Sequence, residues 1–269
     1  MANPATIGPN EVSRHLLNAA ADRSKRSVGV QLPVRFVRSD NALEPPPLAR
    51  ILRGGRGGEV RLKVYLTITM MATAVPYRLE RVAGPRWASM LGLPDPDSAG
   101  TRRVADALSW LAKAQLIQVA RQPGSPPSVT LLDPAGSGAA YTRPTGQYVT
   151  LPIGFWRHQW ITKLSGSATA LLLVLLDLQG GRRSSKDAPF VPADLRRRYG
   201  LSGDTWTRAT RELVDTGLLD VGRQPQGNVF DWQRLRNTYW IQKPRLDEDG
   251  DFELWTASVT VDDSPGVTV

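Results

Sequence analysis

Between residues 201 and 219, apolar and polar positions recur with the period of a helix. The positions of the predicted buried face fall at i, i+3, i+4 and i+7 and are Trp206, Ala209, Thr210 and Leu213. Asp204 precedes them as a candidate N-cap, because a carboxylate can accept from the free amides of the first turn. Gly217 follows as a candidate left-handed helix end, and the next residues alternate as a strand does. The pattern predicts a short amphipathic helix that leads directly into a hairpin.

The same order of elements is predicted twice along the chain. Each copy starts with a Leu-Pro-x-x-Phe segment, continues with a buried helix and a short helix that ends in Gly-Leu, and closes with an amphipathic helix and a hairpin. The hairpins share a Val-x-Arg-Gln-Pro motif. The matched ranges, first copy before second, are 32–36 and 151–155, 59–72 and 168–177, 85–93 and 192–201, 107–111 and 209–213, and 119–123 and 221–225. Such a repeat predicts two copies of one fold.

A helix with exposed threonine and arginine side chains, followed at once by a hairpin, resembles the recognition helix and wing of winged-helix proteins. We therefore expect an α+β, mostly helical fold of two tandem winged helix-turn-helix domains. The expected parts are a flexible N-terminal arm at 1–30, a first domain at 31–132, a linker at 133–147, a second domain at 148–243 and an acidic C-terminal tail at 244–269. For the arm, the alternative is a helix over 11–26 that serves dimerisation or contacts the DNA backbone. A short strand is expected at 252–261.

The distribution of charge indicates an anionic partner. The first 245 residues hold all 34 basic residues and 18 of the 25 acidic ones, which leaves a net charge of +16. A surplus of this size favours nucleic acid as the partner. The rest of the chain carries seven carboxylates and neither Lys nor Arg. We expect this tail to aid solubility; the alternative is that it covers the basic surface and competes with DNA.

The chain lacks the side chains that most catalytic and metal sites need. It has no cysteine and only two histidines, His15 and His158, which cannot form a His-x-His site. No Ser/His/Asp arrangement can be drawn, and the Gly-rich stretch at 54–58 lacks the lysine of a phosphate loop. The carboxylates at 95–97 and 247–251 lack the ligand spacing of a calcium loop. The sequence therefore predicts no enzyme activity, no metal and no cofactor.

Membrane contact is not expected. The longest apolar run covers 170–176, far short of the roughly 18–20 residues of a membrane span. The first ten residues lack the charged-then-apolar pattern of a signal peptide. Together with the absence of cysteine, these features predict a cytoplasmic protein.

The candidate DNA contacts lie on the two amphipathic helices, on the helix before the second of them, and in both hairpins. In the second copy they are Thr205, Thr207, Arg208 and Arg211, then Arg196, Arg197 and Arg198, and in the hairpin Arg223, Gln224, Arg234 and Arg236. In the first copy they are Thr101, Arg102, Arg103, Ser109, Arg121 and Gln122. Asp106 stands where the second copy has Arg208, so we expect the first helix to read DNA less or to mediate dimerisation.

One aligned pair of residues is chemically unlike. Trp110 of the first copy matches Glu212 of the second, which the helical pattern places on the exposed side. An outward tryptophan would be a contact between domains or between the chains of a dimer. The alternative is a partly buried core residue.

Residues 205–213 with 217–219 resemble the DNA-reading half of winged-helix regulators of the GntR type, although Thr207 stands where a second arginine is common. Two basic winged helices joined by a short linker resemble theta-type plasmid replication initiators over residues 31–243. That resemblance implies binding of double-stranded DNA at repeated origin sites, contacts with replication or partition proteins, and a homodimer through the first domain or the arm. The alternatives are a transcriptional or partition regulator and, from another class, a winged-helix interaction subunit of a chromosome-organising complex.

Overall fold

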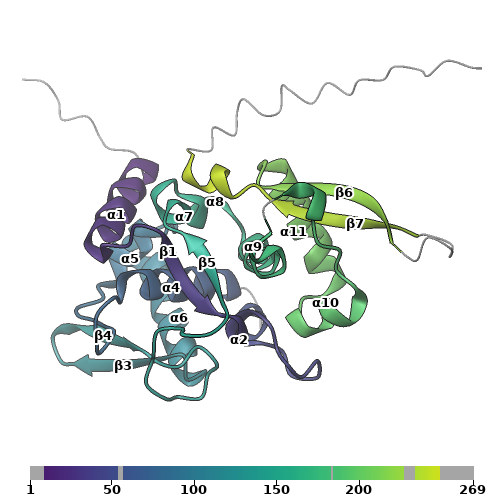
Figure 1. Cartoon of the computed structure of the whole chain (residues 1–269). Helices are drawn as coiled ribbons and strands as arrows, with labels where there is room; N and C mark the ends of the chain where they lie inside the picture. The colour runs from purple at the N-terminus through teal and green to yellow at the C-terminus, as the bar shows by residue number, and fades with distance from the viewer. Residues whose placement is uncertain (1–8, 54–56, 183, 227–233, 249–269) are drawn as a thin grey trace, which may run out of the picture.

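The computed structural model describes residues 9–53, 57–182, 184–226 and 234–248, and the fold is α+β with more helix than strand (Figure 1). The described strands form three small antiparallel sheets. The first half contains α1 (Pro9–Ser24), β1 (Gly29–Pro33), α2 (Val34–Val37), α3 (Pro47–Leu52), α4 (Gly58–Met71), β2 (Arg78–Leu79), α5 (Gly84–Met90), the π-helical turn η1 (Pro96–Gly100), α6 (Thr101–Lys113), β3 (Ile117–Gln122) and β4 (Ser125–Leu131). The second half contains β5 (Tyr148–Pro152), α7 (Gly154–Arg157), α8 (Trp160–Lys163), α9 (Gly166–Gln179), η2 (Ser185–Asp187), α10 (Ala193–Tyr199), α11 (Gly203–Asp215), β6 (Leu219–Gln226), β7 (Arg234–Ile241) and η3 (Lys243–Asp247).

Both halves place their elements in the same order. A strand and two short helices precede a long helix, and a short helix, a helix of 13 residues and an antiparallel hairpin follow. The helices predicted at 59–72 and 168–177 are confirmed as α4 and α9. The first hairpin turn is tighter than predicted, because β3 reaches Gln122 and β4 already starts at Ser125. Gly124 takes the left-handed conformation, with φ of 72°, that this tight turn needs.

The long helices α4 and α9 form the centre of one continuous hydrophobic core. Most residues of both helices are buried; α9 is mainly apolar on all sides, whereas the buried residues of α4 include Lys63, Thr67 and Thr69. In the first half α1, α3 and α6 pack against α4, and in the second α11 packs against α9. The two helices meet near their first turns, where the amide of Gly166 donates to Glu59 Oε2 at 3.3 Å. A side chain in place of Gly166 would collide with the backbone of Glu59. The halves therefore share a core.

Strands β1 and β5 join the two halves edge to edge (Figure 1). Gln31 and Thr150 each precede the repeated Leu-Pro pair, and they lie opposite each other at the centre of the ladder. The pairing extends two residues to either side of this centre. An antiparallel ladder in which matching residues face each other has a local two-fold axis at that point. The strands thus relate the two halves by an approximate two-fold rotation.

Polar contacts also tie the halves together. The carboxylate of Asp177 on α9 accepts from the hydroxyl of Tyr199 at 2.6 Å and lies 3.5 Å from a guanidinium nitrogen of Arg38. Burial, and then the bond to Asp177, raise the pKa of Tyr199, so this hydroxyl stays protonated and donates. Arg53 donates to the carbonyl of Gly200 at 3.2 Å. Because Arg38 and Arg53 belong to the first half, these contacts cross between the repeats.

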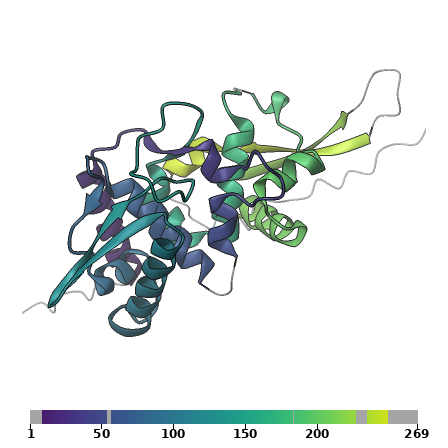
Figure 2. The same ribbon diagram turned by 90° about the horizontal axis from the view of Figure 1, so that it is seen from below.

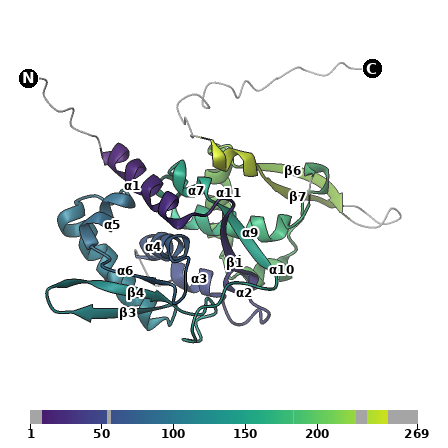
Figure 3. The same cartoon turned by 60° about the vertical axis from the view of Figure 1, so that its left-hand side comes forward.

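The prediction of a flexible N-terminal arm is wrong for the part of it that the structure describes. Helix α1 packs beside α5 and buries Leu17 completely (Figure 3). The hydroxyl of Ser13 donates to the carbonyl of Met90 at 2.8 Å. The apolar side of this helix was visible in the sequence, but the surface that receives it comes from residues about 75 positions further on. Residues 9–24 are therefore part of the packed body.

The connecting segment and the start of the tail are packed as well. In the segment 133–147, Tyr141 is buried and lies edge-on against Tyr77, with 4.7 Å between ring centroids. Leu246 in η3 is fully buried and η3 contacts α7. The strand predicted at 252–261 lies outside the described residues. The two halves are thus parts of one body, in contrast to the two domains joined by a linker that the composition of 133–147 predicted.

Candidate nucleic-acid interface

The second half presents a corner made by α11 and the hairpin β6–β7, called the second corner below. Helix α11 starts at Gly203 because the Ser202 side chain accepts from the amide of Thr205 at 3.2 Å. The predicted cap was wrong: Asp204 lies inside the first turn, where its charge still suits the positive end of the helix. The predicted buried face is confirmed for Trp206, Ala209 and Leu213. Gly217 ends this region in the predicted left-handed conformation, with φ of 67°.

The exposed side of α11 carries two guanidinium groups without an acidic partner. Thr207, Arg208 and Arg211 are exposed, and neither arginine forms an ion pair with any described residue. Thr205 is only partly exposed, and its hydroxyl lies 2.8 Å from Ser202 Oγ. Thr205 therefore completes the helix cap, whereas Thr207 and the two arginines are left to meet a ligand.

Arg223 extends the basic surface of α11 onto the hairpin. Side chains alternate along a strand, so Arg223 shares a face with Val221 and with Tyr239, the partner of Val221 across the ladder. The Tyr239 ring packs edge-on against Trp206 of α11, with 5.9 Å between centroids. This is the face that turns toward α11. Arg223 is exposed there and has no ion pair among the described residues.

The other predicted hairpin contacts lie on the opposite face. Gln224 pairs with Arg236 across the ladder, one residue out of phase with Arg223. Gln224 donates to the carbonyl of Lys186 at 3.3 Å, and the Arg236 guanidinium lies 5.6 Å from the centroid of the Phe190 ring. Arg234 belongs to β7, but its side chain lies outside the described residues. Of the predicted hairpin contacts with described side chains, Arg223 therefore lies on the side of α11, and Gln224 and Arg236 lie on the other.

The three arginines of α10 have three different surroundings. The Arg196 guanidinium stacks 4.7 Å above the Trp206 ring, and Arg198 donates to the loop at 39–40 of the first half at 2.9 Å. Arg197 is exposed. The prediction that all three contact DNA is corrected accordingly: Arg196 and Arg198 are used within the fold, and Arg197 remains a candidate.

Helix α6 and the hairpin β3–β4 form the matching first corner. Arg121 and Ser109 meet there, with 3.4 Å between Nη2 and Oγ. Their matches in the repeat are Arg223 and Arg211. The second corner thus places two guanidinium groups, those of Arg211 and Arg223, where the first corner has one arginine that is hydrogen-bonded to a serine.

The remaining predicted contacts of the first corner are mostly exposed. Arg102, Arg103 and Gln122 are exposed, and neither arginine has an ion pair within the described part of the chain. Thr101 is partly exposed and donates to the carbonyl of Pro96 at 2.6 Å, so its hydroxyl serves the entry of α6. The first corner keeps two free arginines at the start of its helix.

Carboxylates reduce the positive charge of the first corner. Asp106 is exposed on α6. Glu80 follows β2, where a hydrogen bond from Ser128 and the nearby Arg78 lower the pKa of this carboxyl. Glu80 is therefore charged at neutral pH, beside the hairpin. At the position where the second corner has Arg208, an anion would meet the carboxylate of Asp106.

The unlike pair Trp110 and Glu212 holds the long helices in two different ways. Glu212 accepts from the amide and from the hydroxyl of Ser165 at 2.6 Å each, at the N-terminus of α9. Its predicted exposure was wrong, since the side chain is turned inward. Trp110 lies against α4, with the Arg61 guanidinium 4.8 Å above its ring. This contact within the first half favours the partly buried core residue over a dimer contact. Sequence reasoning missed Ser165 and Arg61, because their partners are about 50 residues away in the chain.

The two corners face outward in opposite halves, and their hairpins extend toward opposite ends of the molecule (Figure 2). No cluster of His, Asp or Glu among the described residues could hold a metal ion. None of the described helices has the length and apolarity needed to cross a membrane. Comparisons with protein-family models, with curated proteins and with solved structures found no match.

Proposed function

We propose that the chain binds double-stranded DNA sequence-specifically through two winged-helix units, one in each half. The order of helix, second helix and hairpin in each half is that of a winged helix-turn-helix domain. In such domains the second helix enters the major groove. The observation that carries the proposal is the second corner, where Arg208, Arg211 and Arg223 are exposed on one side without an acidic partner among the described residues.

The spacing of the two helical arginines suits a base-reading surface. Arg208 and Arg211 are three residues apart, so they lie on one side of α11 and about 4.5 Å apart along its axis. Neighbouring base pairs are separated by about 3.4 Å, so the two side chains can reach adjacent steps. Each guanidinium can pair with O6 and N7 of guanine. Arg223 on the hairpin and Thr207 on the helix would then contact phosphates or base edges.

The first corner would be the weaker reader. Arg102, Arg103 and Arg121 supply positive charge there, whereas Asp106 and Glu80 oppose it. Between them the two corners could contact on the order of 6–10 phosphates, so affinity should fall steeply with salt concentration. Because Asp106 and Ser109 stand at the positions of Arg208 and Arg211, most sequence discrimination would come from the second corner.

The shared core makes the pair of units one rigid reader. Because β1 and β5 relate the halves by a local two-fold axis, the units would face the duplex as the two subunits of a symmetric dimer do. The helices α6 and α11 differ in their exposed residues, so the two half-sites would differ in sequence. A single chain would therefore recognise one long, asymmetric site.

Within DNA binding, we propose a plasmid or mobile-element replication initiator, and a transcriptional or partition regulator as the second candidate. Two readers in one body suit a long site that recurs several times, which supports the first. Footprinting on the DNA around the chain's own coding region distinguishes the two. Direct repeats beside an AT-rich stretch are expected for an origin, whereas a single palindrome at a promoter would indicate repression.

Fluorescence anisotropy with a labelled mixed-sequence duplex tests the proposal itself. At low salt the full chain should bind at micromolar concentration or below, and binding should weaken with a log–log salt slope of about −5 to −9. Absence of binding at micromolar protein would contradict the proposal and favour a protein-interaction subunit instead. Rounds of selection from a random duplex pool would then yield the preferred site.

A further inference from the structure

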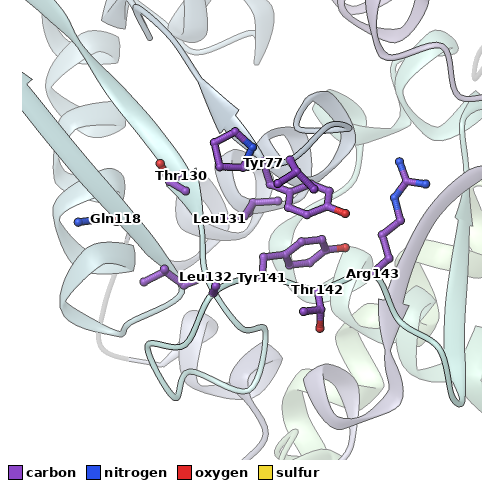
Figure 4. Close-up of a pocket in the computed structure, with 11 residues that line it drawn as sticks. Tyr77, Gln118, Thr130, Leu131, Leu132, Tyr141, Thr142 and Arg143 are labelled. Carbon is purple, nitrogen blue, oxygen red and sulfur yellow. The ribbon is translucent and has the colours of Figure 1, made fainter.

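A pocket lies beside the first corner, between its hairpin and the connecting segment 133–147 (Figure 4). Its volume is about 530 Å³, within the range of about 300–1,000 Å³ that small-molecule sites occupy. The loop before β2, the strands β3 and β4, and the connecting segment line it, mostly with apolar side chains. A pocket of this size and lining can receive the ring of a small organic molecule.

Two tyrosines form one wall and leave their hydroxyl groups without partners. The rings of Tyr77 and Tyr141 meet edge to face at an interplanar angle of 73°. Neither phenol oxygen has a hydrogen-bond partner within the described part of the chain, and both point to the side on which Arg143 lies (Figure 4). Burial raises the pKa of Tyr141, so its hydroxyl is protonated and free to donate. Tyr77 has a φ of 57°, a conformation that bulky residues rarely adopt and that is commoner at ligand sites.

Arg143 brings positive charge to the boundary between this pocket and a second one. Arg143 also lines a neighbouring pocket of about 420 Å³ together with Lys25 and Arg26, and neither pocket has Asp or Glu in its lining. Arg143 donates from Nη2 to the carbonyl of Thr73 at 2.6 Å, which fixes its guanidinium and leaves other N–H groups available. The Arg26 guanidinium donates to the carbonyls of Met70 and Thr69 at 3.0 and 3.1 Å, which leaves Arg143 and Lys25 to meet an anion. Cations held together without a carboxylate form a site for an anion.

We propose that this pocket binds a planar aromatic anion, with its ring against Tyr77 and Tyr141 and its phosphate or carboxylate on Arg143 and Lys25. The ring would bury apolar surface and stack on a tyrosine face, while the two phenol hydroxyls donate to polar atoms at its edge. Nucleoside monophosphates and aromatic carboxylates share this chemistry. Gln118 and Thr130 of the hairpin line the same pocket, so the ligand would touch the strands of the first corner. The inference stands without the DNA-binding proposal.

Isothermal titration calorimetry of the full chain with three anionic probes tests whether the pocket binds an aromatic anion. These are deoxyadenosine monophosphate, thymidine monophosphate and indole-3-acetate, each compared with its neutral nucleoside or amide and with inorganic phosphate. At least one probe should bind with a Kd below about 1 mM, and its neutral analogue about tenfold more weakly. The phosphate and carboxylate arms identify which anion is preferred. If no probe binds below 1 mM, or if neutral analogues or phosphate alone bind as tightly, the proposal is overturned.

Charge-removing variants locate the site. Arg143→Gln and Lys25→Gln should each weaken the best probe, the first by about tenfold or more. Arg86→Gln removes a charge that is also exposed, from α5 and outside the pocket, and this variant should bind the probe as the unaltered chain does. Circular dichroism checks that each variant is folded. If Arg143→Gln does not fold, the Lys25→Gln variant tests the site. An unchanged affinity of Lys25→Gln for the probe would contradict the assignment of the anion to this site.

Discussion

The two helix–hairpin corners share their buried sides and differ on their exposed sides. Leu111 of α6 and Leu213 of α11 occupy matching positions and are both fully buried. On the outside, Arg211 stands where the first corner has Ser109, and Arg208 where it has Asp106. Packing constrains the inner positions of a repeated fold, whereas the outer positions are free to specialise. The comparison therefore assigns the fold to what the corners share and the DNA specificity to what they do not.

The two corners also anchor their helices differently. Ser202 caps α11 with its side chain, whereas α6 continues from the π-helical turn η1 without a side-chain cap. Glu212 binds the first turn of α9 through two hydrogen bonds, whereas Trp110 and Arg61 stack at the matching place on α4. Similar backbones are thus held by polar contacts in one half and by an aromatic contact in the other.

The largest loss of stability is expected from substitutions on the buried sides, and it should be the same in both corners. Leu213→Ala and Leu111→Ala each remove a fully buried side chain, and we expect each to lower the free energy of unfolding by about 2–5 kcal/mol. Urea denaturation followed by circular dichroism measures both. If one substitution cost less than about 1 kcal/mol, the buried sides would not be equivalent.

Removal of the carboxylate that binds α9 should affect the second corner alone. Glu212→Ala breaks two hydrogen bonds of a charged, partly exposed group, and we expect a loss of about 1–2 kcal/mol in the free energy of unfolding. Asp215→Ala is the control, because this residue is exposed on the same helix. Equal values for the two variants in urea denaturation would show that the contact with Ser165 adds no stability.

The smallest loss of stability is expected from removal of the side-chain cap of α11. Ser202→Ala removes the acceptor for the amide of Thr205 and should cost about 1 kcal/mol. Ser98 precedes α6 and caps nothing with its side chain, so Ser98→Ala should change stability by less than about 0.5 kcal/mol. A thermal melt of each variant distinguishes these values. A loss in Ser98→Ala as large as that in Ser202→Ala would show that the Ser98 side chain stabilises the start of α6.

Local sequence patterns predicted the long helices, the buried sides and both hairpins. They did so because these features depend on residues three, four or two positions apart. The cap at Ser202 was misplaced by two residues, since Asp204 is as good a capping residue by type. The two-fold ladder of β1 with β5 could not be read from the segments alone, because each strand is short and its partner lies in the other half.

The predicted DNA contacts were right where they depended on local pattern and wrong where they depended on distant segments. Exposure was correct for Arg208, Arg211 and Arg102, which lie on the polar sides of regular helices. It failed for Arg198 and Glu212, whose partners belong to distant segments. Tertiary hydrogen bonds of this kind leave no periodic signal in a sequence.

The most direct test of the central claim compares the two corners on the same DNA. Fluorescence anisotropy with the selected duplex should show that Arg208→Ala with Arg211→Ala loses on the order of 30-fold or more in affinity, at about 1–3 kcal/mol per guanidinium. Arg102→Ala with Arg103→Ala should lose less. Arg157→Ala with Arg245→Ala removes two charges outside both corners and should change affinity by about twofold at most. An unchanged affinity in the first variant, or a greater loss in the second, would contradict the assignment of base reading to α11.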